Sequence, residues 1–329
     1  MLTLGDHIGA YQLREVIGSG NSALVYLAEP LHQSGPRVAI KLRSRGQSPH
    51  EATLAARFTE SARLHLQFCH PNIAWLHESV EAESYQALII EYLAGGTLAD
   101  YLKQIGGRMS LEAACLLGVH LCDGLEHMHD IQIIHRDIKP DNLLFADPND
   151  LTSIRIADFD VSKNPYTSPK LTEQGSHVGT LCYTAPEQFN QEKPRPAADV
   201  YGLGMVLFEA ISGRLPFSSV TAPAIFSRFL DKTPLPLLSS LVPEVSTALD
   251  WIIERSLTVE PEERIPSAAT FAALLLAVCP TIRSSFKREH ELMRLVRLDW
   301  LDECIPSSPN PTKQILTQGL AQLGIQLRH

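Results

Sequence analysis

The chain has 329 residues, of which 44% are hydrophobic and 20% charged, and its formal net charge at pH 7 is −9. This length suffices for one large domain or two packed lobes, and the acidic balance argues against a general affinity for nucleic acid or an anionic membrane. Because the six cysteines form no C-x-x-C pair and no apolar stretch could span a bilayer, we expect a cytoplasmic protein with reduced thiols.

The first third of the chain predicts a small β-rich unit. Three short segments within 11–42 are rich in strand-forming residues, and Gly18 and Gly20 mark a turn between the first two. Residues 49–68 carry apolar side chains at positions 54, 58, 62 and 66, which is the spacing of one helix face. Another buried strand is expected over 86–93.

The remainder predicts a larger helical unit and an appended tail. Helices are expected over 97–105, 110–130, 197–213, 221–231 and 246–256, with a strand-like patch over 133–161. We therefore divide the chain into residues 1–90, residues 91–280 and a helical extension over 281–329. An apolar stripe in the extension predicts either a cap on the large unit or a docking surface for a partner. The stripe consists of Leu292, Leu295, Val296, Leu298 and Trp300.

Two motifs carry candidate groups for phosphate chemistry. The glycine turn in "IGSGNS" would let backbone N–H groups face phosphate oxygens, although most such glycine pairs are plain hairpin turns. Lys41 ends the apolar strand "VAIK", where a phosphate is a natural partner for a lysine. The run "HRDIKPDN" combines Asp137, Lys139 and Asn142, which could accept a hydroxyl proton, neutralise a phosphoryl group and hold a divalent ion.

Together these motifs resemble the eukaryotic-type (Hanks-type) serine/threonine protein kinases, in a bacterial version. The segments "VAIK", "HRDIKPDN", "DFD", "GTLCYTAPEQ" and "DVYGLG" occur in that family's order over roughly residues 11–279. The resemblance implies an α+β, bilobal fold, with a small β-rich N-lobe (1–90) and a larger α-helical C-lobe (91–280). It also implies transfer of the γ-phosphate of ATP to serine or threonine of a protein substrate, including autophosphorylation, with Mg²⁺ or Mn²⁺.

The resemblance assigns roles residue by residue. Asp137 would orient the attacking hydroxyl and accept its proton, and Lys139 would stabilise charge on the γ-phosphate. Asn142 and Asp158 would hold the metal, while Lys41 would hold the α- and β-phosphates. The residues expected to bind the nucleotide, with the hinge over 91–93, are Gly18, Gly20, Val25, Ala39, Lys41, Glu91, Leu93 and Leu144.

The helix residue that pairs with Lys41 is less certain from the sequence. Counting back from "HPNI" puts Ser61 at that position, whereas a slip of one residue puts Glu60 there. The slip also brings Leu64, rather than His65, to the apolar packing position four residues later. We therefore predict Glu60 as the partner of the lysine and a member of the catalytic set; the alternative is a solvated acid on the helix surface.

Three departures from the family pattern point toward an alternative function class. Ala23 replaces the third glycine of the phosphate loop, Asp160 stands where the family usually has glycine, and Ser61 is a candidate for the acid's position. The alternative is a pseudokinase that acts as a nucleotide-binding scaffold or regulator. An active kinase stays the first reading, because Lys41, Asp137, Lys139, Asn142 and Asp158 are all present. A small-molecule phosphotransferase is a third reading, disfavoured by the long segment that ends in "GTLCYTAPEQ".

That segment also indicates how the activity could be regulated. Its acceptors Thr167, Ser168, Thr172 and Ser176 could be phosphorylated, and a phosphate there would pair with Arg136. A structural ion pair between Glu187 and Arg264 is expected from the family. The expected partners are a protein substrate, a second copy during autophosphorylation and a protein docked on 281–329, but no nucleic acid or membrane. The substrate, the activating signal and the oligomeric state stay open.

Overall fold

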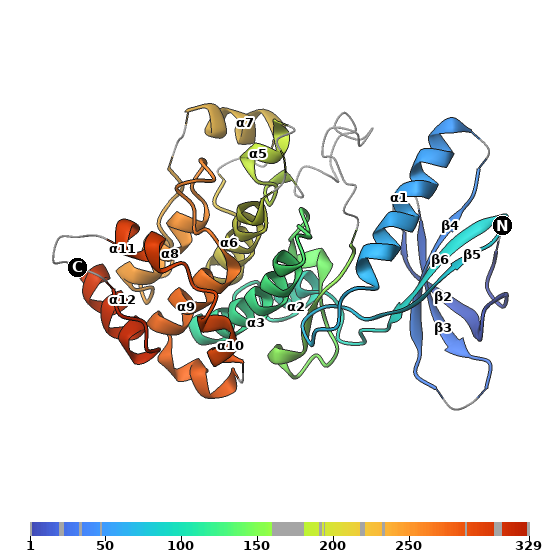
Figure 1. Ribbon diagram of the computed structural model, residues 1–329, viewed down its shortest axis with the longest axis horizontal. Coiled ribbons are helices and arrows are strands. Elements are labelled where there is room, and N and C mark those ends of the chain that lie inside the picture. The colour runs from blue at the N-terminus through green and yellow to red at the C-terminus, as the bar shows by residue number, and fades with distance from the viewer. Residues whose placement is uncertain are drawn as a thin grey trace.

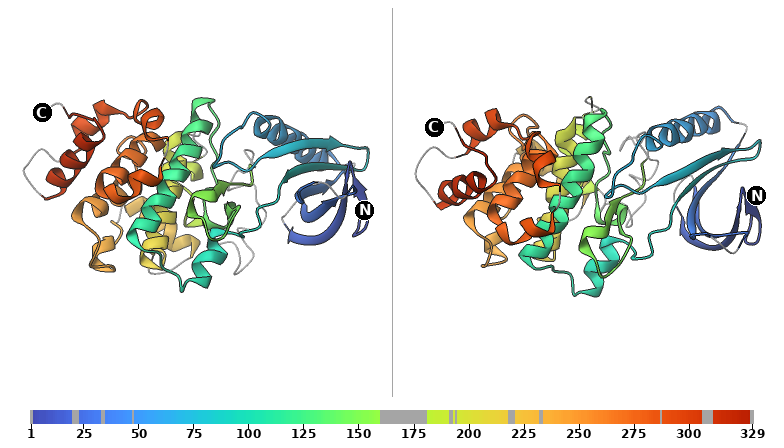
Figure 2. Two further views of the ribbon diagram at one scale, coloured as in Figure 1. Left: turned by 90° about the horizontal axis from the view of Figure 1, so that it is seen from below. Right: turned by 60° about the horizontal axis from the view of Figure 1, so that its bottom comes forward.

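The computed structural model consists of a β-rich lobe and a larger helical lobe, joined end to end (Figure 1). The N-terminus lies in the β-rich lobe, and the last helices lie at the opposite end of the molecule (Figures 1 and 2). The structure describes residues 2–19, 23–32, 35–46, 48–159, 181–190, 193, 195–217, 221–231, 234–286, 288–305 and 311–327.

The N-lobe is a six-stranded antiparallel sheet with one long helix. The strands, in the spatial order β1-β2-β3-β4-β6-β5, are β1 (His7–Ile8), β2 (Tyr11–Ser19), β3 (Leu24–Pro30), β4 (Val38–Ser44), β6 (Tyr85–Glu91) and β5 (Leu76–Glu81). The helix α1 (Pro49–His65) contacts β5 and β6. The α+β, bilobal fold predicted from the motifs is confirmed.

Register within this sheet gathers three of the predicted nucleotide-binding residues. Gly18 on β2 lies opposite Val25 on β3, and Val25 lies opposite Lys41 on β4. Directly opposed residues of antiparallel strands project to the same face. The alternate residues, among them Ile40 and Ile89, are fully buried in a separate core on the other face. A slip of one residue would therefore turn Lys41 away from its face.

Helix α1 has a capped start and one buried face. The Ser48 side chain accepts a hydrogen bond from the Glu51 N–H at 3.2 Å, and Pro49 stands in the first turn, where its missing N–H costs nothing. The buried face contains Ser61, Ala62 and His65. The expectation that position 66 lies on that face is wrong, because Leu66 follows the last helical residue and is 50% exposed.

The C-lobe is built mainly from helices around one core. Its elements are α2 (Leu98–Gln104), α3 (Leu111–Asp130), η1 (Pro140–Asn142), β7 (Leu143–Phe145), η2 (Leu151–Ser153), β8 (Ile154–Ile156), α5 (Pro186–Phe189), α6 (Pro196–Ser212), α7 (Ala222–Asp231), η4 (Leu238–Ser240), α8 (Thr247–Ser256) and α9 (Ala268–Val278). The predicted helices at α2, α3, α6, α7 and α8 are confirmed. Helix α9 was not predicted, because it is apolar all round and shows no amphipathic period.

A buried ion pair ties the segment between α8 and α9 to α5. The two terminal guanidinium nitrogens of Arg264 donate to Glu187, at 2.8 and 3.1 Å, and Arg264 is fully buried. Arg264 also donates to the carbonyls of Ala197, Thr258 and Val259. This confirms the pair expected from the family, and removing one partner of such a pair costs about 3–5 kcal/mol.

The extension after residue 279 packs on the C-lobe rather than standing apart. Its elements are η5 (Pro280–Ser285), α10 (Glu289–Met293), α11 (Leu298–Cys304) and α12 (Pro311–Gln322), of which α12 packs against α8 and α9 (Figure 1). Leu292 and Trp300 of the apolar stripe are buried in the core cluster of the C-lobe, while Leu295 and Leu298 are each 41% exposed. The buried part of the stripe therefore caps the C-lobe, while the rest remains exposed.

The sequence led us to expect no membrane-spanning segment, and the length and apolar character of the helices bear on this. Within the described ranges, none of the helices combines the length and the apolar character needed to cross a bilayer.

Replacing Gly319 by alanine should loosen the extension. A Cβ at position 319 would lie 2.1 Å from the carbonyl oxygen of Ala277, which belongs to the backbone of α9 and cannot turn aside. Alanine favours a helix over glycine by about 1 kcal/mol, but overpacking typically costs about 1–3 kcal/mol or more. We expect a lower free energy of unfolding in urea. Gln318→Ala, on the exposed face of the same helix, is the matched control; equal stability of the two variants would contradict the packing argument.

Candidate active site

Three polar residues of the segment between α3 and β7 form a hydrogen-bonded group. The amide nitrogen of Asn142 donates to the Asp137 carboxylate at 2.9 Å and to the Asp137 carbonyl at 2.8 Å. Lys139 Nζ lies 3.3 Å from the other carboxylate oxygen of Asp137. Since the amide nitrogen of Asn142 is used in this way, its side-chain oxygen is the atom left to bind a cation.

The backbone of this segment, whose residues 133–142 are named the catalytic loop below, is held by a carboxylate from α6. Asp199, which is 1% exposed, accepts hydrogen bonds from the N–H groups of His135 at 2.9 Å and Arg136 at 2.7 Å. His129 Nε2 donates to the same carboxylate at 2.9 Å. Arg136 has φ = 68°, a left-handed conformation that is costly for a non-glycine residue. The two N–H bonds to Asp199 hold that conformation in place.

The protonation state of Asp199 depends on these contacts. Burial raises the pKa of this carboxyl, but the hydrogen bond from His129 and the nearby imidazoles of His129 and His135 outweigh burial, so the pKa lies below its usual value. The side chain is thus an anion at neutral pH, which the three donors require.

The N-lobe lysine and the predicted metal ligand meet in an ion pair. Lys41 Nζ lies 2.5 Å from Oδ1 of Asp158, and both side chains are partly buried, at 22% and 33% exposed. Asp158 has φ = 62°, a conformation that aspartate tolerates better than most residues. Asp158 stays close to the catalytic loop because the N–H of Ala157 donates to the carbonyl of Asn142 at 2.9 Å.

The predicted pairing of Glu60 with Lys41 is not found in this structure. Glu60 is 51% exposed and makes a two-pronged ion pair with Arg63 one turn along the helix. Ser61 instead faces inward, with 6% exposure, and its hydroxyl donates to the carbonyl of Phe159. The prediction that Glu60 occupies the inner position is therefore wrong. That prediction was preferred because it brought Leu64 to the apolar packing position four residues later.

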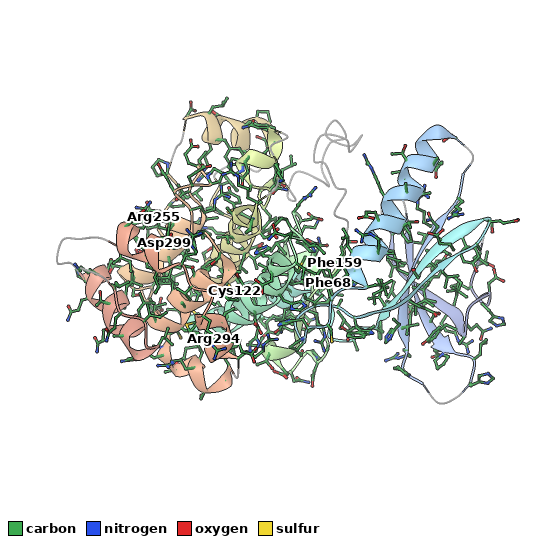
Figure 3. The ribbon with its side chains drawn as sticks, viewed as in Figure 1. Phe68, Cys122, Phe159, Arg255, Arg294 and Asp299 are labelled. Atoms are coloured by element: carbon green, nitrogen blue, oxygen red, sulfur yellow. The ribbon has the colours of Figure 1, made fainter. Side chains whose placement is uncertain are left out.

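Aromatic rings connect α1 to the catalytic loop. The ring of His65 packs on Phe159 with centroids 4.2 Å apart, and His135 meets Phe159 edge-on at 5.3 Å. Phe68 lies 5.1 Å from Phe159, and both phenylalanines lie near the end of α1, between the lobes (Figure 3). His65, not Leu64, therefore takes the packing position four residues after the inward-facing Ser61.

A neutral imidazole explains how a histidine fills an apolar position. His65 is 3% exposed and donates from Nε2 to the carbonyl of Ala74 at 2.7 Å. Burial lowers its pKa to about 4, against the smaller opposing effect of the Ala74 hydrogen bond. An uncharged ring of this kind packs like an aromatic residue while satisfying one buried carbonyl.

The segment between the lobes contains the remaining nucleotide-binding candidates. The Glu91 N–H donates to the carbonyl of Trp75 at 2.9 Å, and its carboxylate accepts from Trp75 N–H and pairs with Arg155 at 3.0 Å. Leu93 is buried, and Leu144 forms an isolated bridge with Thr97. Ala39 lies opposite Ile90 on β6.

The donor set fits a divalent cation with phosphate ligands. The carboxylate of Asp158 and the amide oxygen of Asn142 are hard oxygen donors of the kind that Mg²⁺ and Mn²⁺ prefer. No group of three or more His, Cys, Asp or Glu side chains among the described residues is arranged to hold a metal by itself. Mg²⁺ commonly binds through one or two carboxylates plus waters and phosphate oxygens, so two protein ligands suffice.

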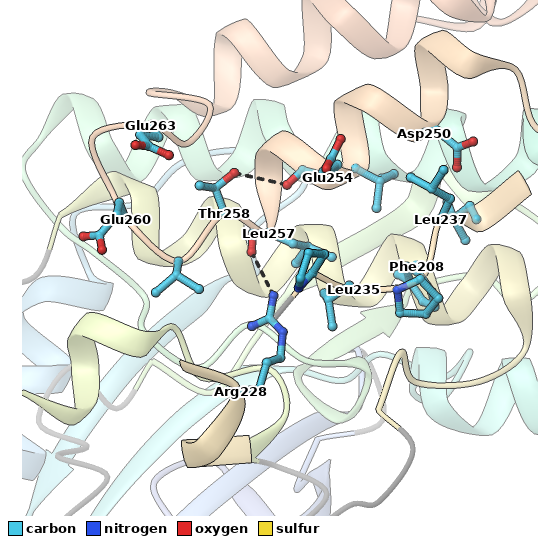
Figure 4. A pocket seen from close by; sticks show the side chains of 15 residues that line it. Phe208, Arg228, Leu235, Leu237, Asp250, Glu254, Leu257, Thr258, Glu260 and Glu263 are labelled. Atoms are coloured by element: carbon cyan, nitrogen blue, oxygen red, sulfur yellow. Dashed lines mark hydrogen bonds between the residues drawn. The ribbon is translucent and has the colours of Figure 1, made fainter. Parts of the chain in front are cut away.

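A cavity of about 270 Å³ lies elsewhere in the C-lobe, between α7, α8 and the segments 234–238 and 257–260 (Figure 4). Arg228 of α7 reaches across it to the carbonyl of Leu257, at 3.5 Å. None of the candidate site residues lines this cavity. Its size alone does not make it the active site, because the groups suited to phosphate chemistry lie between the lobes.

Comparison with known proteins agrees with the motifs. Residues 11–287 match the family described as "Protein kinase domain".

The chain belongs to the protein kinase domain family.

Named relatives come from several bacteria. The kinase domain is similar to serine/threonine-protein kinase PrkC of Bacillus subtilis (30% identity; 87% of this chain and 43% of that protein) and Pkn1 of Myxococcus xanthus (32%; 87% and 40%). It is 33% identical to PknA of Mycobacterium tuberculosis, over 82% of this chain and 61% of that protein. The chain thus spans 40–61% of the length of these relatives.

A solved structure supports the fold alone. The crystal structure of Rad53 1–466 in complex with AMP-PNP matches with a TM-score of 0.64 and 23% identity, over 80% of this chain and 64% of that one.

Some candidate positions of the kinase domain lie outside the described residues. They are Gly20, Asp160, Thr167, Ser168, Thr172 and Ser176.

Sequence reasoning missed three residues that position the site. Asp199 was quoted only within "DVYGLG", yet it fixes the backbone before Asp137. His135 donates from Nε2 to the carbonyl of Ala157 at 3.0 Å and accepts from the Asp137 N–H at 3.3 Å, so it joins the two halves of the site. His65 could have been found from the same count that placed Ser61 on the inner face.

Replacing Asp199 by asparagine should disorganise the catalytic loop of the kinase domain. Asparagine offers one acceptor oxygen where three donors converge, and its NH₂ group would face a donor. Leaving such a group unpaired costs about 1–3 kcal/mol, and the strained Arg136 would lose its support. We expect a lower melting temperature and faster hydrogen exchange over residues 133–142. Exchange unchanged from the wild type in that segment would contradict the role given to Asp199.

Stability should depend on pH through His65. Its pKa is about 4 when folded and near 6.5 when unfolded, so the unfolded chain binds the proton first as the pH falls below 6.5. From pH 7 to 5 this one group should lower the free energy of unfolding by about 2 kcal/mol, and the loss is complete below the folded pKa. Urea unfolding of wild type and His65→Leu at both pH values tests this. The other histidines are present in both proteins. The same change in the free energy of unfolding between pH 7 and pH 5 in both would therefore refute the lowered pKa of His65.

Proposed function

We propose that this chain is an ATP-dependent serine/threonine protein kinase that also phosphorylates itself. The observation that supports this most directly is the Asp137 carboxylate, held by Asn142 and 3.3 Å from Lys139. Around it lie a lysine and an aspartate, Lys41 and Asp158, that already meet in an ion pair. This collection of charges and amides suits phosphoryl transfer, which depends on positioning and charge neutralisation rather than covalent chemistry.

Each residue of the proposed mechanism has a role that its contacts permit. The Asp137 carboxylate would orient the substrate hydroxyl and accept its proton, while the hydrogen bond from Asn142 keeps it in one orientation. Lys139, beside it, would stabilise negative charge on the transferred group. Lys41 would shift from Asp158 toward the α- and β-phosphates.

A divalent cation, Mg²⁺ or Mn²⁺, would be held by Asp158 and Asn142. When bound, it would neutralise phosphate charge in the transition state. The chain's own part is to keep a carboxylate oxygen and an amide oxygen near each other, through the hydrogen bond between Ala157 and Asn142.

The adenine would lie against the segment 91–93. Because the N–H of Glu91 is engaged by Trp75, its carbonyl is the backbone group left to accept from the adenine amino group. Val25, Ala39, Leu93 and Leu144 would supply the apolar walls, and the turn at Gly18 and Gly20 would cover the phosphates.

The kinase activity would be regulated through the segment 160–180. The enzyme would be cytoplasmic. The Arg136 guanidinium is half-buried, and its Nε has no hydrogen-bond partner among the described residues. A phosphate on Thr167, Ser168, Thr172 or Ser176 would pair with this arginine. Self-association would bring one copy's segment to another copy's site. A partner docked on 281–329 would meet the exposed part of the apolar stripe, Leu295 and Leu298, since Leu292 and Trp300 are buried.

The proposed activity can be tested by autophosphorylation with labelled ATP and Mg²⁺, followed by mapping of the labelled sites by mass spectrometry. Asp137→Asn keeps the size and hydrogen-bonding reach of the side chain but removes the proton acceptor. Loss of a general base typically lowers the rate about 10²–10⁴-fold, so label should vanish in the variant. We expect labelled sites within 160–180 of the wild type.

Nucleotide binding serves as the control. ATP with Mg²⁺ should raise the melting temperature of wild type and Asp137→Asn alike, because Asp137 is not assigned to the nucleotide. Equal label in both proteins would mean a contaminating kinase. No label in either, with the thermal shift retained, would instead favour the pseudokinase.

A further inference from the structure

Ser61 links the N-lobe helix to the segment that carries the predicted metal ligand. It lies on the buried face of α1 with 6% exposure, and its hydroxyl donates to the carbonyl of Phe159. Phe159 directly follows Asp158 in the chain. The bond therefore holds the carbonyl of the residue that follows the predicted metal ligand.

A second contact with the N-lobe holds the side chain of Asp158. Lys41 Nζ binds the carboxylate of Asp158 at 2.5 Å, while the backbone of Asp158 is left-handed, with φ = 62°. A conformation of this kind persists only when its surroundings determine it. Lys41 and Ser61 hold Asp158 from two directions, and both belong to the N-lobe.

A serine at this position does something that a carboxylate cannot do. In protein kinases the lysine is paired with a glutamate of the N-lobe helix. Here Glu60 points to solvent and pairs with Arg63, and Ser61 occupies the inner position. A hydroxyl cannot neutralise a lysine, but it can donate to a carbonyl, whereas an ionised carboxylate only accepts.

We propose that Ser61 is a positioning residue, whose hydroxyl holds the Phe159 carbonyl and thereby keeps Asp158 oriented for the metal. This inference rests on the proposed kinase function. Ser61 acts through Phe159 and touches neither nucleotide nor substrate. Its loss should affect the use of Mg²⁺ and the turnover rate more than the affinity for ATP.

The competing explanation is that packing alone holds Phe159. His65 and Phe68 contact its ring, with centroids 4.2 and 5.1 Å away. If these contacts suffice, Ser61 only fills space, and alanine would serve equally well. The test must therefore separate an effect on the Phe159 backbone from a general loss of stability.

The kinetic test compares Ser61→Ala with Ser61→Thr, which keeps the hydroxyl, and with Ser79→Ala, the same change at an exposed position of β5. Ser61→Ala should lower kcat roughly 3- to 10-fold, the equivalent of one ordinary hydrogen bond, and raise the Mg²⁺ concentration for half-maximal activity. The KM for ATP should stay within about twofold, because other residues bind the nucleotide. Ser61→Thr should recover most of both effects. Wild-type kcat and Mg²⁺ dependence in Ser61→Ala would overturn the proposal.

A spectroscopic test needs no activity. Phe159–Asp160 is the one Phe-Asp dipeptide in the sequence, so labelling with carbonyl-¹³C phenylalanine and ¹⁵N aspartate yields a single correlated signal for the Phe159 carbonyl. A carbonyl that loses a hydrogen bond moves upfield. We expect that shift in Ser61→Ala without nucleotide or metal, and not in Ser61→Thr or Ser79→Ala. An identical signal in wild type and Ser61→Ala would overturn the proposal. If the alanine variant fails to fold, the nearly isosteric Ser61→Cys takes its place, since a thiol donates only weakly.

Ser61→Glu separates two roles for this position. If the position is meant to pair with Lys41, the glutamate should match or exceed wild-type activity, and that result would overturn the proposal. If Ser61 holds the Phe159 carbonyl, the carboxylate should repel both that carbonyl and Asp158, and activity should fall below that of Ser61→Ala.

The two hypotheses fail differently. If wild type and Ser79→Ala both lack phosphotransfer, the proposed function fails, but the carbonyl signal still decides the role of Ser61. If both are active and the signal does not respond to Ser61→Ala, the positioning role fails and the kinase activity stands.

Discussion

The carboxylate of Asp199 is the constraint on which the geometry of the candidate site depends. It lies on α6, a helix with fourteen buried residues, so its position is set by the core of the C-lobe. From there it accepts hydrogen bonds from two backbone N–H groups of the catalytic loop and from His129. An unpaired buried charge would be strongly destabilising, so the loop and the carboxylate require each other. The strain at Arg136 and the orientation of Asp137 follow from this arrangement.

The N-lobe meets this rigid base in two ways. The segment that follows α1 is built into the base: Phe68, Ile73 and Ala74 belong to the main core, and Asn72 donates to the carbonyls of Thr152 and Ile154. The contacts of the sheet and of α1 with the site include two polar ones, Lys41 with Asp158 and Ser61 with Phe159. They also include the aromatic contacts that run from His65 through Phe159 to His135. A rotation of α1 would change the aromatic and the serine contacts together, because Ser61 and His65 lie one turn apart.

The sequence predicted the fold and most helices, because the motifs and the amphipathic periods are local features. It also named residues that come together in space, among them Asp137, Lys139 and Asn142. It failed at the inner face of α1, where a leucine was preferred to a histidine. That preference ignored the fact that a buried imidazole can remain neutral and pack as an aromatic ring. Asp199 was missed for a different reason, since its donors lie more than sixty residues earlier in the chain.

The ion pair between Lys41 and Asp158 bears on how α1 can serve this site when Glu60 faces solvent and Ser61 takes the inner position. Both side chains are partly exposed, so water weakens their attraction and the pair can separate at little cost. Under the proposed function, each partner would then become available to a group of opposite charge, the lysine to a phosphate and the carboxylate to a cation. A buried glutamate on α1 would hold the lysine more tightly but would add negative charge beside Asp158. Serine avoids this repulsion, and its neutral hydroxyl keeps holding the Phe159 carbonyl whichever partners the two charged side chains have.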